Sequence, residues 1–287
     1  MTKPVKKAVI PAGGLGTRFL PVTKTVAKEL LPIGTKPTLL MVIEEAVESG
    51  IEEIILVTSP IKTQIIDFFS NDTAYMRELE AQGKGDMIKG LKALTSKVRI
   101  RTVYQEEPKG LGHAVLCAAA DVGNDPFIII LPDVLITSKA PCCRQLMDAY
   151  AKAGCSVSAT EHTPRDQIHL YGIYDIERSD GRMHWARRVV EKPSADEAPS
   201  DLSVVGRYLF TPEVFELLET TQPGKGGEIQ LADAMNALAK AGKMVAYEYE
   251  GRQFDTGDVM GFLKANIYYN WHLGPEELQE FVKEMVG

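Results

Sequence analysis

A glycine-rich segment with nearby cations is the part of the sequence best suited to binding phosphate groups. Residues 11–18 read Pro-Ala-Gly-Gly-Leu-Gly-Thr-Arg and directly follow a short apolar run. Glycines let the backbone approach a ligand and turn its N–H groups toward an anion. Arg18, Lys24 and Lys28 add three positive charges. Because Phe19 stands where a dinucleotide fingerprint needs its third glycine, that fingerprint does not fit, and the glycines alone could form an ordinary turn.

Two aspartates could hold a metal ion. Asp133 follows the apolar residues 127–131, and Asp255 lies in the run Phe-Asp-Thr-Gly-Asp. Ligands of parallel α/β sheets bind beyond the carboxyl ends of the strands, and Mg2+ prefers carboxylate, phosphate and water oxygens. An aspartate after a strand is also common as a turn or cap residue, and Asp258 is a rival for Asp255. Asp-Thr-Gly also occurs in aspartic proteases, but those need a paired carboxylate in an all-β setting, and the sequence has one such triplet.

The first half of the chain alternates between short apolar runs and segments with helical periodicity. Strands are expected at 7–12, 54–58, 98–104 and 127–131, and helices at 37–50, 62–69 and 114–120. The polar stretch 71–95 is expected to be a helical excursion. Strands that alternate with helices predict right-handed crossovers and an α/β fold, with a Rossmann-like, mixed but mainly parallel sheet flanked by helices.

The second half has strand-like segments with few helices between them. These lie at 156–160, 171–176, 187–191 and 204–210, and helical patterns return at 228–241 and after Val259. The succession predicts antiparallel strands added to the sheet. No long linker interrupts the chain, so residues 1–287 are expected to form one domain.

Composition excludes several functional classes. The formal net charge of −7 argues against a nucleic-acid-binding protein. No apolar run approaches the roughly 18 residues that a membrane span needs, and the N-terminal residues show no signal-peptide pattern. The four cysteines do not form a disulfide or zinc pattern. A cytoplasmic protein with reduced thiols is therefore expected.

The order and spacing of these motifs resemble the sugar-1-phosphate nucleotidyltransferases. The signature G-x-G-T-R-x-x-P-x-T-x-x-x-x-K-x-x-x-P is matched at residues 14–32, and the run Lys-Glu-Leu-Leu-Pro at 28–32 is similar to that of the bacterial UTP–glucose-1-phosphate uridylyltransferases. The resemblance extends from about residue 7 to residue 270. It departs from the family at Ala27, where proline is usual, and at Gly227, where an acidic residue is frequent. Both departures leave the charged residues intact.

The resemblance implies a role for most of these residues in a fold of the nucleotidyltransferase, glycosyltransferase-A-like type. About residues 1–135 would bind the nucleotide, and about 136–287 the sugar phosphate. Nucleotide binding is implied for Ala12, Gly13, Gly14, Gly16, Thr17, Gln105, Gly110 and Gly112. The Gln105 amide can donate and accept at the same time, which suits the edge of uracil. His113 is expected to have a packing or capping role at a helix start rather than a catalytic one.

The remaining implied roles concern the sugar phosphate, the metal ion and catalysis. The residues implied for the sugar phosphate are Gly172, Glu191, Lys192 and Val205. Asp133 and Asp255 would bind Mg2+. The catalytic residues would be Arg18, Lys28, Asp133 and Lys192.

The expected reaction is an in-line attack of glucose 1-phosphate on UTP, without a covalent intermediate. The cations would stabilise the departing pyrophosphate. Two alternatives remain open: another base or sugar phosphate, with dTTP, CTP or ATP as donor, or a catalytically silent regulator that binds a sugar nucleotide. A homo-oligomer, either a dimer or a tetramer, is also expected from the resemblance.

Overall fold

The computed structural model describes residues 2–70 and 72–286, and its strands are mostly short. They are β1 (Lys7–Pro11), β2 (Pro32–Ile33), β3 (Lys36–Pro37), β4 (Glu53–Thr58), β5 (Arg99–Tyr104), β6 (Phe127–Ile130), β7 (Val134–Thr137), β8 (Ser156–His162), β9 (Gly172–Asp180), β10 (Met183–Glu191), β11 (Leu202–Phe210), β12 (Met244–Glu248) and β13 (Arg252–Asp255).

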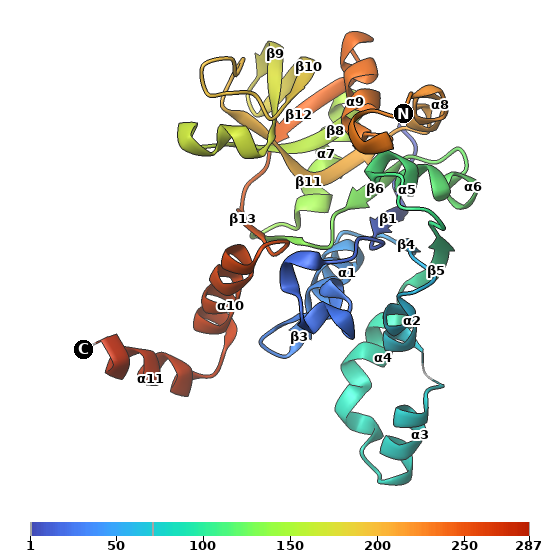
Figure 1. Ribbon diagram of the computed structural model, residues 1–287, viewed down its shortest axis with the longest axis vertical. Helices are drawn as coiled ribbons and strands as arrows, with labels where there is room; N and C mark the ends of the chain where they lie inside the picture. The colour runs from blue at the N-terminus through green and yellow to red at the C-terminus, as the bar shows by residue number, and fades with distance from the viewer. Residues whose placement is uncertain (1, 71, 287) are drawn as a thin grey trace.

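Helices connect many of these strands (Figure 1). They are α1 (Thr38–Glu48), α2 (Thr63–Phe69), α3 (Ala74–Ala81), α4 (Lys89–Thr95), α5 (Leu111–Cys117), α6 (Ala119–Val122), α7 (Cys142–Ala153), α8 (Glu213–Thr220), α9 (Leu231–Lys240), α10 (Val259–Leu273) and α11 (Glu276–Val286). Helices α3 and α4 lie in a lobe at one end of the molecule, and α11 extends away from the body (Figure 1).

One large mixed sheet organises the fold. Over the residues described, its strand order is β5-β4-β1-β6-β11-β8-β12-β10-β9. Strands β5, β4, β1 and β6 are parallel, β11 runs antiparallel to both β6 and β8, and the β9–β10 hairpin lies at the far edge. The predicted α/β class with a mixed sheet is therefore confirmed. In this sheet the strands of the first half of the chain pair with one another only in parallel, whereas the later strands join mostly with antiparallel pairing, and β12 is parallel to β8.

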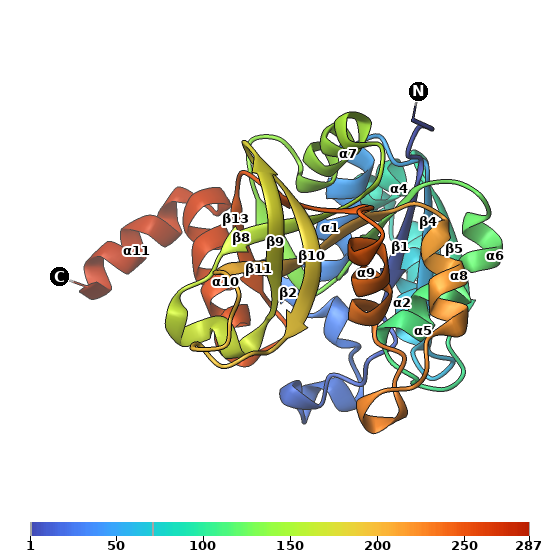
Figure 2. The same cartoon turned by 90° about the horizontal axis from the view of Figure 1, so that it is seen from above.

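The central strands separate two apolar cores. Successive side chains of a strand point to opposite faces, and β1 follows this rule, with Ile10 in one core and Val9 in the other. Helices α1 and α7 cover the first face, and α5, α8 and α9 cover the second (Figure 2). Burial on both faces explains why β4 and β6 read as continuous apolar runs rather than as alternating ones.

Most of the predicted elements are present. The expected excursion at 71–95 contains α3 and α4, although Asn71 itself lies outside the described residues. Helices α7 and α8 and strands β7, β12 and β13 were not predicted. Within the described part of the chain, no helix is long and apolar enough to cross a membrane.

Candidate active site

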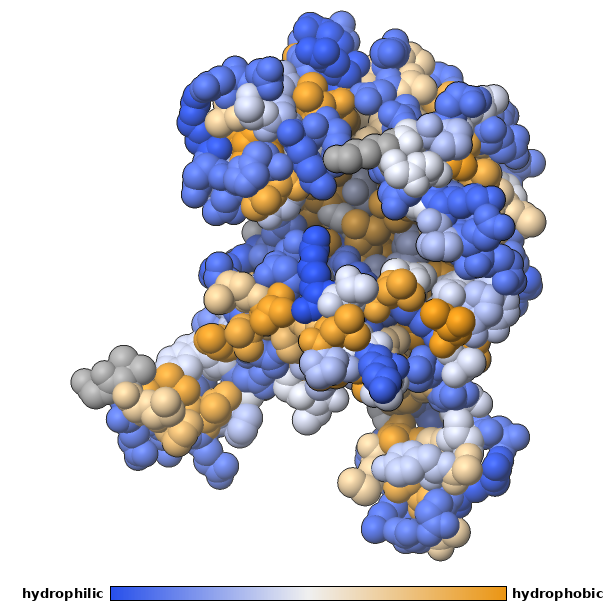
Figure 3. Space-filling model, viewed as in Figure 1, coloured by the Kyte–Doolittle hydropathy of each residue, from blue (hydrophilic) through white to orange (hydrophobic). Residues whose placement is uncertain are grey.

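Parallel pairing brings three of the predicted segments to one edge of the sheet. Strands β1, β5 and β6 all run in the same direction, so their carboxyl ends lie together. The glycine-rich loop follows β1, Gln105 follows β5, and Asp133 follows β6. Figure 3 shows the molecule hollowed between the part that carries β9, β10 and α9 and the part that carries the N-terminal turns and α10.

The glycine-rich loop contacts both Lys28 and Gln105. Gly16 has a positive φ of 68°, and a methyl group added there would lie 2.9 Å from Lys28 Cβ. A methyl group added to Gly13 would lie 3.3 Å from Gln105 Oε1. Position 16 therefore requires glycine, and Gly13 leaves little room for a side chain. Gly14 and Thr17 are exposed on the same loop.

A buried ion pair holds the base of this loop. The Lys62 ammonium donates to both carboxylate oxygens of Glu29, at 2.8 and 3.0 Å, and to the carbonyl oxygen of Ala12, at 2.9 Å. Burial raises the pKa of Glu29 and lowers that of Lys62. The attraction between the two charges shifts both pKa values the other way, but burial has the larger effect. The pair joins the start of the loop to the residue beside Lys28. Neither partner is among the predicted site residues, because no local pattern links positions this far apart in the sequence.

The two predicted metal ligands lie together. A methyl group added to Gly257 would be 3.0 Å from Asp133 Oδ2 and 3.0 Å from Asp255 Oδ1, so both carboxylates border the same small space. Thr256 fixes the approach of the two segments, since its N–H and hydroxyl both donate to the carbonyl oxygen of Asp133. Strand β13 pairs with β7, which places Asp255 opposite Val134.

The predicted cations reach the same space. Lys28 Nζ lies 2.6 Å from Asp133 Oδ2. Burial opposes the charge of Lys28, but the neighbouring carboxylates, above all Asp133, outweigh it and raise the lysine's pKa. The Arg18 guanidinium is exposed and donates to the carbonyl oxygen of Gly257 at 3.3 Å. The structure thus gathers Arg18, Lys28, Asp133 and Asp255 from three distant parts of the chain.

Asp258 has a different role from its neighbour Asp255. Its side chain accepts a hydrogen bond from the N–H of Gly261 at 3.0 Å and caps the N-terminus of α10. This is the capping role considered for Asp258 in the sequence, and it leaves Asp255 as the carboxylate that faces Asp133.

Burial and neighbouring negative charges raise the pKa of Asp255. Desolvation is the largest cause, and the charges of Asp133 and Asp258 add to it. The hydrogen bond from the N–H of Gly257 acts in the opposite direction and lowers the pKa. A carboxyl group whose pKa is higher in the folded than in the unfolded state lowers the free energy of unfolding when the pH is above both values, where the group is ionised. The penalty disappears when the pH falls below the unfolded-state pKa, where the group is protonated in both states. Two carboxylates held together in this way suit a divalent cation, which would relieve their repulsion.

We therefore expect Asp255→Asn to raise the melting temperature in EDTA at pH 7.5 by about 1–3 °C, while it lowers activity. The gain should shrink as the pH falls toward the ordinary aspartate range near 4. Thermal unfolding at several pH values measures this, and Asp148→Asn on the exposed side of α7 is the control. A lower melting temperature in Asp255→Asn, or a gain that does not change with pH, would contradict the expectation.

The Gln105 loop borders the glycine-rich loop. The Gln105 side chain is buried, and its amide nitrogen donates to the carbonyl oxygen of Gly110 at 3.1 Å. Gly110 and Gly112 pack against Ile229, and the N–H of Gly112 donates to the carbonyl oxygen of Ile229 at 2.9 Å. Because the N–H of Gly112 already donates to Ile229, it cannot also donate to a base. A base could contact only the other backbone atoms of Gly112.

The predicted sugar-phosphate residues cluster at the end of the β9–β10 hairpin. Gly172 pairs with Glu191, and a methyl group on Gly172 would lie 3.3 Å from Glu191 Oε2. Lys192 follows directly, with an exposed side chain and a φ of 47°. A lysine in the left-handed region is strained, and such strain is typical of functional sites. Val205 differs, because its side chain is buried in the core and only its backbone could meet a sugar.

Two tyrosines outside the predicted set of site residues are affected by carboxylates of the site. Burial raises the pKa of Tyr171, and the charge of Asp255 adds to the effect. Burial likewise raises the pKa of Tyr208, followed by the charges of Glu191 and Asp133.

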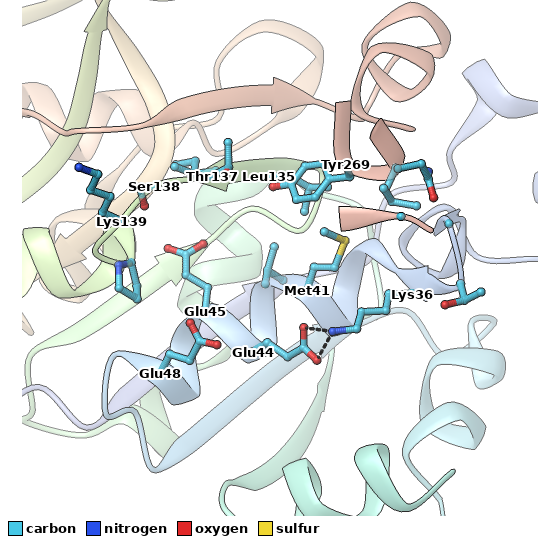
Figure 4. Close-up of a pocket in the computed structure, with 18 of the residues that line it drawn as sticks. Lys36, Met41, Glu44, Glu45, Glu48, Leu135, Thr137, Ser138, Lys139 and Tyr269 are labelled. Carbon is cyan, nitrogen blue, oxygen red and sulfur yellow. Dashed lines mark hydrogen bonds and ion pairs between the residues drawn. The ribbon is translucent and has the colours of Figure 1, made fainter. Parts of the chain in front are cut away.

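A separate cavity of about 590 Å³ lies between α1, β7 and α10. It is lined by Glu44, Glu48 and Tyr269 among others, and Lys36 pairs with Glu44 at 2.9 Å (Figure 4). None of the predicted site residues lines it. The site described above is therefore the open hollow at the carboxyl edge of the sheet rather than this cavity.

Comparison with known proteins agrees with this geometry. The family model of the nucleotidyl transferases matches residues 7–270. The UTP–glucose-1-phosphate uridylyltransferase of Bacillus subtilis (strain 168) is 45% identical over 267 residues, which are 93% of this chain and 91% of that protein. Among solved structures, a UDP-glucose pyrophosphorylase complexed with UDP-glucose is 39% identical with a TM-score of 0.83, covering 93% of this chain and 98% of that one. A UTP-bound UGPase from Acinetobacter baumannii is 37% identical with a TM-score of 0.89, covering 98% and 99%. The chain belongs to the nucleotidyl transferase family.

Proposed function

We propose that this chain transfers the uridylyl group of UTP to glucose 1-phosphate and forms UDP-glucose and pyrophosphate. The observation that carries this proposal is the meeting of Asp133 and Asp255 with Lys28 and Arg18 beside the glycine-rich loop. Relatives that match nearly the whole chain are named for this reaction, and similar solved structures hold UTP or UDP-glucose.

The reaction is a single in-line displacement. A phosphate oxygen of glucose 1-phosphate attacks the α-phosphorus of UTP, and the bond from that phosphorus to the oxygen bridging to the β-phosphate breaks. The attacking group is already anionic, so the protein does not need to supply a nucleophile. Its task is to place two anions together and to reduce their repulsion. Lys192 places the sugar phosphate, and Glu191 accepts hydrogen bonds from sugar hydroxyls.

Asp133 and Asp255 are the residues that would hold Mg2+. Two carboxylates that face one space fit this ion, which usually takes its remaining ligands from phosphates and water. In the described residues no group of three or more such side chains forms an all-protein metal cage. Mg2+ would supply positive charge to the reacting phosphates. Lys28 and Arg18 stabilise the charge of the departing pyrophosphate.

The two substrates are assigned to different halves of one domain with a Rossmann-like, glycosyltransferase-A-like sheet. Residues 1–135 bind the nucleotide, and residues 136–287 bind the sugar phosphate. Support comes from the position of Gln105 and the glycine loop in the first half and of Glu191 and Lys192 in the second. The reaction takes place in the cytoplasm.

The protein works as a homo-oligomer, either a dimer or a tetramer. Support comes from exposed apolar side chains on α10 and α11, among them Ile267 and Phe281. Helix α11 extends away from the rest of the molecule, which leaves its apolar face open to a second copy (Figure 1).

Product analysis tests the function directly. Purified protein with UTP, glucose 1-phosphate and Mg2+ should form UDP-glucose and pyrophosphate in equal amounts, detected by phosphorus NMR, and EDTA should stop the reaction. Binding of UTP without either product would support the silent regulator instead.

Isotope exchange tests the absence of a covalent intermediate. Without glucose 1-phosphate, labelled pyrophosphate should not enter UTP, because no uridylyl group can leave UTP before the sugar phosphate arrives. Exchange at a rate near that of turnover would require a uridylyl-enzyme and would overturn the single displacement.

A further inference from the structure

The Gln105 amide is held by two acceptors that fix which way it faces. Its nitrogen Nε2 lies 3.1 Å from the carbonyl oxygen of Gly110 and 2.9 Å from His113 Nδ1. A carbonyl oxygen can only accept, so the amide NH2 and not the amide oxygen must face Gly110. The second hydrogen of that NH2 then points to His113. The Cys117 sulfur also approaches His113 Nδ1, at the longer distance of 3.8 Å.

This arrangement leaves the amide oxygen of Gln105 for a ligand. In the described residues no donor bonds to Oε1, and this atom is not completely buried, so it can accept a hydrogen bond from a ligand. It faces the glycine-rich loop, where a methyl group on Gly13 would lie 3.3 Å away. An oriented acceptor therefore points toward the place assigned to the nucleotide.

We propose that His113 is a positioning residue that sets base specificity by holding the Gln105 amide with its oxygen toward the base. The inference rests on the proposed function and assigns a specificity role to a residue outside the reacting groups. In this role His113 Nδ1 accepts the hydrogen bond from the Gln105 amide, and the ring N–H lies on Nε2.

The chemistry of the bases explains why orientation decides specificity. Uracil carries a donor at N3, whereas the N3 of cytosine is an acceptor. An amide oxygen facing the base bonds to uracil N3–H and opposes the lone pair of cytosine N3. If the amide turned over, its NH2 would favour cytosine instead. Sites with fixed hydrogen-bonding groups reject a mismatched partner strongly, because the buried group is left unpaired.

His113 adds a constraint that Gly110 alone does not give. If Gly110 were the only acceptor, the Gln105 amide would keep a single hydrogen bond. The amide could then rotate, because its second N–H would not be bound. With both acceptors the reversed amide would place its oxygen against the Gly110 carbonyl oxygen and the lone pair of His113 Nδ1. The histidine thus makes the reversed orientation costly without touching the substrate.

The test compares UTP with CTP in matched variants. His113→Leu removes the acceptor, whereas His113→Asn keeps one, since the asparagine Oδ1 can take the place of Nδ1. We expect the ratio of kcat/KM for UTP to that for CTP to fall about tenfold in His113→Leu, with the fall coming mainly from faster use of CTP. His113→Asn should keep most of the wild-type ratio. His113→Ala provides a second variant without an acceptor if the leucine does not fold.

Several outcomes separate this inference from the proposed function. An unchanged UTP-to-CTP ratio in a folded His113→Leu or His113→Ala protein would overturn the positioning role, even if both rates fell together. An equal loss of specificity in His113→Asn would also overturn it, because the acceptor would then not be the cause. A wild-type protein that makes no UDP-glucose would instead refute the proposed function.

Discussion

Asp133→Asn should lower kcat by about 1,000-fold and leave the fold intact. The carboxylate lies 2.6 Å from Lys28 Nζ and borders the same space as Asp255. Its loss removes half of the negative charge available to a divalent cation. The hydrogen bonds that join this position to Thr256 are accepted by the backbone carbonyl oxygen of Asp133, so the substitution keeps them.

Steady-state kinetics and a thermal melt check this prediction, and Asp258→Ser is the matched control. Serine retains the N-cap of α10 and removes a carboxylate of similar position, so this variant should keep turnover within about threefold of wild type. Wild-type turnover with ordinary Mg2+ dependence in Asp133→Asn would remove Asp133 from the mechanism. A large loss in Asp258→Ser would make Asp258 the second metal ligand in place of Asp255.

Lys192→Ala should lower kcat/KM for glucose 1-phosphate by about 100-fold and change the KM for UTP little. The lysine follows the end of β10 directly after Glu191, and its side chain is exposed. An ammonium there attracts the phosphate of the attacking substrate. The φ of 47° places its backbone in the left-handed region, which is strained for a lysine and is typical of functional sites.

Two further variants separate the ammonium from the backbone. Lys192→Gly relieves the positive φ and lacks the ammonium, so it should lose as much kcat/KM for glucose 1-phosphate as Lys192→Ala and be no less stable. Arg187→Ala on the same strand removes an exposed cation that pairs with Asp175, and it should keep normal kinetics. If Lys192→Gly were active, the contribution of Lys192 would come from its backbone and not from its charge.

The strands that carry the proposed nucleotide site could be predicted from the sequence alone. Strands β1, β4 and β6 are buried on both faces, so their apolar runs are long and easy to recognise, and parallel pairing then places Gln105 and Asp133 at one edge. Asp255 could be assigned only through the family resemblance. Its approach to Asp133 depends on the short β7–β13 pair, which no periodic pattern indicates.

Interactions between distant charged residues could not be predicted. Arg207 is fully buried and pairs with Glu45, while it also donates to the carbonyl oxygen of Leu131, two residues before Asp133. No local pattern links Arg207 to Glu45, because 162 positions separate them in the sequence. The same is true of Lys62 and Glu29 beneath the glycine loop. Such pairs become visible only when the fold brings their elements together.

The decisive measurement is pyrophosphate release with glucose 1-phosphate, Mg2+ and each triphosphate in turn. We expect rapid release with UTP, slow release with CTP and ATP, and none in EDTA. Equal or faster release with CTP or ATP would contradict the assignment of Gln105 to uracil. No release with UTP from folded protein would contradict the proposed function itself.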